Sequence, residues 1–93
     1  MVTSIILINT TRTDVNTVAE ELSDIEGISE VYSVSGSYDL VAIVRVRSND
    51  ALAELVTKKM LRIDGIEKTE TMLAFRAFSQ HDLERMFSVG LDD

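Results

Sequence analysis

Stretches of alternating or continuous apolar residues divide the chain into four predicted strands. Residues 2–9 are nearly continuous in Ile and Leu, too short for a typical helix and rich in β-branched side chains, which favours a buried strand. Residues 28–35 and 38–46 flank Gly36-Ser37 and predict a β-hairpin with a tight turn. Residues 66–77 alternate, so we expect a fourth strand with one face formed by Thr69, Thr71, Leu73 and Phe75.

Apolar side chains at helical spacing predict helices over residues 14–24 and 50–61. A short third helix is predicted over about residues 79–89, where Ser79 and Asp82 resemble a capping box. We expect this helix to close a single domain spanning residues 1–93. The expected N-caps of the two longer helices are Thr13 or Asp14 for the first, and Ser48, Asn49 or Asp50 for the second.

A short phrase occurs twice, at residues 24–28 and 62–66, each time between a predicted helix and a strand. Its glycines, Gly27 and Gly65, suit a helix end because glycine accepts the left-handed conformation. The chain therefore repeats a strand-helix-strand unit. Two such units in succession, βαββαβ, predict an α+β, ferredoxin-like domain with strand order 4-1-3-2 and both helices on one face of an antiparallel sheet.

The middle of this predicted sheet is apolar on both faces. Leu40, Ala42 and Val44 point to one side of their strand, whereas Val41 and Ile43 point to the other. Helices cover only one of these faces, and an uncovered apolar patch is a liability for a soluble monomer. We therefore expect at least a dimer that packs sheet against sheet, in a barrel-like assembly.

Charge and cysteine content narrow the class of function. Sixteen acidic residues against nine basic ones give a net charge of −7, which disfavours nucleic acid and anionic membranes as direct partners. The absence of cysteine excludes disulfides and thiolate metal sites. No apolar run approaches the length of a spanning helix and no signal peptide is apparent, so we expect a cytoplasmic location.

Two features could bind a small molecule. In the turn Gly36-Ser37-Tyr38-Asp39, backbone N–H groups could hold a carboxylate while Asp39 accepts from an α-ammonium group, a pairing that suits a zwitterion. Thr69 and Thr71 share a strand face, so their hydroxyls could line the same cleft. A purely structural interpretation is open for both, because Tyr38 and Asp39 could only fix the turn and threonine is a common strand residue.

Residues 34–40 and 63–71 resemble the two signature stretches of the Lrp/AsnC transcription regulators, and in particular their C-terminal effector domain, called RAM. The resemblance covers about residues 1–77 and implies a stand-alone RAM domain without the family's helix-turn-helix domain. It further implies dimers that associate into octameric or decameric rings, amino acids bound between dimers at residues 36–39, 69 and 71, and co-assembly with a full-length regulator. No cofactor is implied.

Two other functions remain open at this point. Ferredoxin-like dimers also include small monooxygenases and isomerases, although the chain shows no nucleophile-base pair, no clustered histidines and no paired carboxylates on one strand face. The single histidine, His81, makes no metal site by itself. A structural oligomer without a ligand is the second alternative.

Overall fold

The computed structural model describes residues 1–78, and the predicted helix at residues 79–89 lies outside this part. The elements follow the order βαββαβ. In chain order they are β1 (Val2–Thr10), α1 (Val15–Ser23), β2 (Ile28–Ser33), β3 (Leu40–Val46), α2 (Asn49–Glu54) with its π-helical and 3₁₀ continuations η1 (Leu55–Lys59) and η2 (Met60–Arg62), and β4 (Ile66–Leu73).

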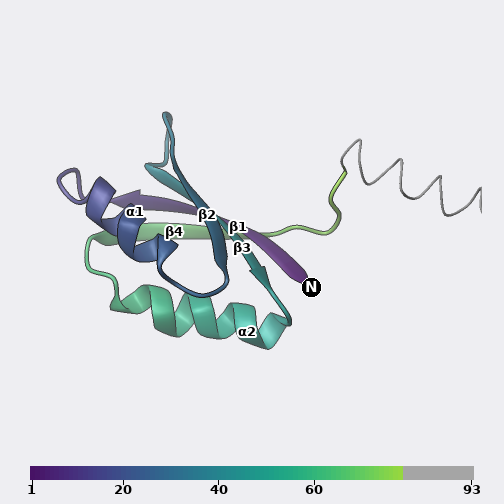
Figure 1. Ribbon diagram of the computed structural model, residues 1–93. Coiled ribbons are helices and arrows are strands. Elements are labelled where there is room, and N and C mark those ends of the chain that lie inside the picture. Colours follow the sequence, from purple (N-terminus) through teal and green to yellow (C-terminus); the bar gives the residue numbers. More distant parts are fainter. Residues whose placement is uncertain (79–93) are drawn as a thin grey trace, which may run out of the picture.

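The four strands form one antiparallel sheet in the order β2-β3-β1-β4. This is the predicted order 4-1-3-2 read from the other edge, and the ferredoxin-like architecture is confirmed. Both helical segments pack on the same side of the sheet (Figure 1). The second side is free of helices in the described part of the chain.

The core lies between the sheet and the helices and follows the strand alternation. Ile6 and Ile8 of β1 are fully buried together with Leu40, Ala42 and Val44 of β3. They pack against apolar side chains of the helical layer, namely Val18, Leu22, Leu55 and Met60. Every buried polar side-chain atom among residues 1–78 has a hydrogen-bond partner, so the core carries no unsatisfied polar group there.

The second helical segment begins as predicted but changes its winding. Ser48 is the N-cap, and its hydroxyl accepts a hydrogen bond from the Ala51 N–H at 3.1 Å. After Glu54 the helix widens into a π-helical turn and then tightens into a 3₁₀ turn that ends at Arg62. The helix predicted over residues 50–61 is therefore present with nearly that extent, and its second half departs from α-helical winding.

The first helix begins at Val15, and Asp14 occupies its N-cap position. The Asp14 side chain does not cap a helix N–H, however, because its carboxylate accepts from the Thr11 hydroxyl instead. β4 also ends at Leu73 rather than at Ala77 as predicted. The Ala74 N–H still donates to the Thr3 carbonyl at 3.0 Å, close to the first residue of β1, and no strand pairing is seen beyond it in residues 1–78.

Candidate ligand-binding site

The hairpin between β2 and β3 is wider than the predicted tight turn. Its loop covers residues 34–39, and a hydrogen bond from the Val34 N–H to the Asp39 carbonyl, at 3.0 Å, closes it. Gly36 has a φ of +115° and no atom within 4 Å of the position of a Cβ. The glycine is thus required by the backbone conformation and not by lack of space.

Asp39 ties this loop to β1. Its carboxylate Oδ2 accepts from the Thr10 N–H at 2.8 Å, and its own N–H donates to the Ile8 carbonyl at 3.0 Å. These contacts support the structural interpretation of Asp39. The other carboxylate oxygen has no hydrogen-bond partner among residues 1–78, so it is free to accept from a ligand.

Tyr38 reaches across the sheet to β4. Its hydroxyl donates to Oε2 of Glu70 at 2.6 Å. This hydrogen bond, together with partial desolvation and the negative charge of Glu70, raises the pKa of the Tyr38 phenol above its ordinary value. The contact ties the β3 end of the hairpin loop to the edge strand β4, across β1.

Thr69 and Thr71 share one face of β4, as predicted. They lie opposite Ile8 and Ile6 in the register with β1, which places them on the side of the sheet that carries the helices. Both are exposed, because β4 is an edge strand.

Glu70 lies on the other face, opposite Leu7. One chain therefore directs the Tyr38 hydroxyl and the two threonine hydroxyls toward opposite faces of the sheet.

Sequence reasoning missed Glu70. The pairing of β1 with β4 would have drawn attention to it. This pairing places the Glu70 carboxylate beside Leu7, in a row of otherwise apolar side chains on the helix-free face. A charged side chain at such a position usually has a partner, and here the partner is the Tyr38 hydroxyl.

The helix-free face of the sheet carries a continuous aliphatic surface. Ile5 lies opposite Ile43, and Leu7 lies opposite Val41. All four are only partly buried. Tyr32 of β2 and Met72 of β4 extend this surface to both edges and are 49% and 43% exposed. We call these six residues the open face.

Metal binding finds no support in the described residues. No group of three or more His, Asp or Glu side chains within residues 1–78 could hold a metal ion. His81 lies outside the described part of the chain. Among the helices of residues 1–78, none is long and apolar enough to cross a membrane.

Comparison with known proteins agrees with this geometry. The profile of the Lrp/AsnC ligand-binding domain matches residues 3–83. The chain belongs to the Lrp/AsnC family. Its ferredoxin-like sheet is the fold of that family's ligand-binding domain, and its curated relatives are transcription regulators.

Three relatives illustrate the range of similarity. The protein TTHA0845 from Thermus thermophilus is 41% identical and superposes with a TM-score of 0.81, covering 86% of this chain and 100% of that chain.

The transcriptional regulator PF0250 of Pyrococcus furiosus is 34% identical over 58 residues, which are 62% of this chain and 39% of the regulator. The chain thus spans less than half the length of that curated relative.

The regulator NMB0573 of Neisseria meningitidis, whose structure is a complex with L-Met, has a TM-score of 0.76. It is only 11% identical over 85% of this chain and 53% of that chain, and so shares the fold alone.

Proposed function

We propose that this domain binds a free amino acid between subunits of a homo-oligomer and that binding shifts the assembly. The observation that carries the proposal is the base of the hairpin, where Asp39 keeps one carboxylate oxygen free. The loop N–H groups of residues 35–38 donate no backbone hydrogen bond within residues 1–78. A free acceptor beside free donors fits the ammonium and carboxylate groups of a zwitterion.

The division of the predicted site between two faces supports a ligand held by more than one subunit. Thr69 and Thr71 belong to the helix side of the sheet and Tyr38 reaches the other side, so one chain does not enclose a ligand with all of them. A second subunit that presents its own β4 edge beside the hairpin supplies the missing wall. A ligand that bridges subunits stabilises the assembly in which both halves of its cleft exist.

The open face supports the oligomer itself. Six apolar side chains on the helix-free side cover all four strands, and a second copy of the chain offers the same surface in return. The family's description as a ligand-binding domain agrees in kind with this proposal. Rings of dimers and co-assembly with a full-length regulator are extensions that rest on the family resemblance.

Thermal unfolding of the purified protein against each amino acid tests the proposal, with native mass recorded in parallel. A ligand present at about 100 times its Kd stabilises each site by about 2.7 kcal/mol, which raises Tm by roughly ten degrees for a domain of this size. We expect one amino acid, or a chemically related group, to give such a shift.

Asp39→Asn is the decisive variant. The amide oxygen still accepts from the Thr10 N–H, but the residue no longer carries the charge that pairs with an ammonium group. The shift should disappear in Asp39→Asn and persist in Asp24→Asn, an exposed aspartate at the end of α1. No shift with any amino acid, from a protein already of oligomer mass, would instead support a structural oligomer.

A further inference from the structure

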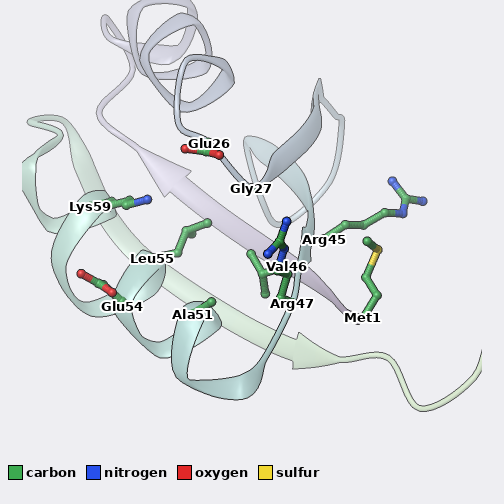
Figure 2. A pocket seen from close by; sticks show the side chains of 10 residues that line it. All are labelled: Met1, Glu26, Gly27, Arg45, Val46, Arg47, Ala51, Glu54, Leu55 and Lys59. Atoms are coloured by element: carbon green, nitrogen blue, oxygen red, sulfur yellow. The ribbon is translucent and has the colours of Figure 1, made fainter.

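A cleft lies at the end of the sheet away from the hairpin. It has a volume of about 350 Å³, within the range of small-molecule sites. Its apolar floor is formed by Val46 and Leu55, with Gly27 and Ala51 beside them (Figure 2). Charged side chains from three segments surround this floor, and none of them belongs to the site proposed above.

The repeated architecture of the chain shows why this space is open. Gly65, after the second helical segment, packs on Val18 of the first, and Gly27, after the first, packs on Leu55 of the second. A Cβ at Gly65 would also lie 3.1 Å from the Cβ of Asp14, four residues before Val18. The equivalent position, four residues before Leu55, is Ala51, and no Ala51 atom is among the nearest neighbours of a Cβ at Gly27. Both glycines are in close contact with side chains, and the two turns differ in that Asp14 lies beside Gly65 whereas Ala51 stays beyond 4 Å of the Cβ position at Gly27.

The π-helical turn contributes directly to the cleft. Gly27 follows Val18 by nine positions, whereas Gly65 follows Leu55 by ten, and the wider winding of η1 accommodates the extra residue. Leu55 and Lys59 are the two ends of this turn, and both line the cleft. Single π-helical turns inside helices are rare and occur frequently at functional sites.

Two cations at the cleft have no carboxylate partner in the described part of the chain. Arg47 and Lys59 line it, and neither forms an ion pair within residues 1–78. The Arg47 side chain lies over the space between Gly27 and Ala51, whereas Arg45 extends away (Figure 2). Arg45 pairs with Glu30 at 3.8 Å. Two carboxylates, Glu26 and Glu54, line the cleft as well, so its three cations exceed them by one. On a chain of net charge −7, the unpaired Arg47 and Lys59 over an apolar floor point to an anion with an apolar body.

We propose that this cleft binds a small aliphatic carboxylate, with its carboxylate on Arg47 and Lys59 and its aliphatic chain on Val46 and Leu55. Glu26 also lines the cleft and offers a partner for an α-ammonium group. The ligand is therefore either a plain aliphatic acid or the corresponding amino acid. Isocaproate and leucine differ only by that amino group and distinguish the two sources.

Amide chemical shifts of the intact protein, titrated with isocaproate, provide the first test. We expect saturable changes at Val46, Ala51 and Leu55. Arg47→Ala and Lys59→Ala should each weaken binding at least tenfold, and the matched controls Arg62→Ala and Lys58→Ala should leave it unchanged. Ala51→Leu, which keeps a good helix former and fills the opening, should abolish binding without unfolding the protein.

The leucine titration separates this site from the hairpin site. Tighter binding of leucine at the same three amides, lost in Glu26→Gln, identifies the amino acid as the ligand. If leucine binds as tightly as isocaproate or more weakly, the ligand of the cleft is a plain aliphatic carboxylate. Asp39→Asn should change neither titration at these amides, so failure of the hairpin proposal leaves this one standing. The proposal is overturned if neither compound shifts these amides, or if the shifts survive Arg47→Ala and Lys59→Ala.

Discussion

Asp39 combines two roles that a pair of substitutions separates. Asp39→Ala removes the acceptor of the Thr10 N–H, which lies at a buried residue, and should lower the free energy of unfolding by about 1–2 kcal/mol. Asp39→Asn retains an acceptor and should cost well under about 1 kcal/mol. Urea denaturation monitored by circular dichroism measures both. Equal destabilisation by the two variants would mean that charge, and not the hydrogen bond, holds the loop to β1.

The two tyrosines of the chain provide a second prediction. Tyr32 donates to Glu30 and Tyr38 donates to Glu70, and these hydrogen bonds are the largest cause of the raised pKa of each phenol. The tyrosinate absorbance of the folded protein should therefore appear above the ordinary pKa of about 10. Glu70→Gln should return one of the two steps toward that value and leave the other in place. Two steps at the ordinary value in the unsubstituted protein would contradict the Glu70 contact.

The raised pKa values of the two tyrosines also determine how the stability of the protein changes with pH. A phenol whose pKa is raised in the folded state stabilises that state fully below the pKa of the unfolded chain. This contribution is lost as pH rises through the folded-state pKa, so alkaline solution should lower Tm in this range. The loss should be smaller in Tyr38→Phe, which has no proton to release at that position.

Some of these residues could be found from sequence and others could not. The hairpin residues could be identified from the sequence, because Gly36, Tyr38 and Asp39 form a recognisable turn motif. Glu70 required the register between β1 and β4, since its meaning depends on Leu7 beside it and on Tyr38 across the sheet. Periodicity assigns a side chain to a face but does not say which distant residue it meets.

The helix-to-strand turns make a prediction about the elements they join. Gly27, Gly36 and Gly65 all have positive φ, so alanine is strained at each. At Gly36 a Cβ meets open space, and the substitution should cost about 1 kcal/mol. At Gly27 and Gly65 it meets side chains at 2.9–3.0 Å as well, and the cost should be about 2 kcal/mol or more. If the urea midpoint falls by the same amount in all three variants, backbone strain alone determines the loss of stability.

The helices could be placed because each has an apolar stripe, a cap residue before it and a glycine after it. The end of β4 could not, since the alternation continues past Leu73 with no residue that marks a boundary. The winding of the second helix could not, because a π-helical turn shifts the apolar stripe by one residue and leaves the composition ordinary. The loop of the hairpin was also predicted too short. The last pair in the register is Ser33 with Leu40, one hydrogen bond from the Val34 N–H to the Asp39 carbonyl follows it, and Asp39 bonds through its own N–H and its carboxylate to β1.

The open face makes a prediction about the assembled molecule. Val41 and Ile43 lie at its centre on β3, opposite Leu7 and Ile5 of β1. If the open face is the subunit interface proposed above, Val41→Glu places a charge in it and should raise the dissociation constant of the oligomer at least tenfold. Thr17→Glu, on the exposed side of α1, is the control and should leave the mass unchanged. Light scattering during size-exclusion chromatography measures both, and an undiminished mass for Val41→Glu would exclude the open face as the interface.

The architecture of the domain could be predicted because the repeated phrase marks two successive strand-helix-strand units. The cleft at the end of the sheet away from the hairpin could not, since it depends on Gly27, Val46 and Ala51 meeting from three separate segments.

The strand order has a consequence for how the domain acquires its structure. The two strands of each repeat are never neighbours, so all three strand pairs, β1 with β3, β1 with β4 and β2 with β3, join one repeat to the other. Neither repeat alone contains a pair of hydrogen-bonded strands. Fragments cut within the exposed hairpin loop should each be unstructured and should regain the native circular dichroism only when mixed, as an obligate pair of complementing halves.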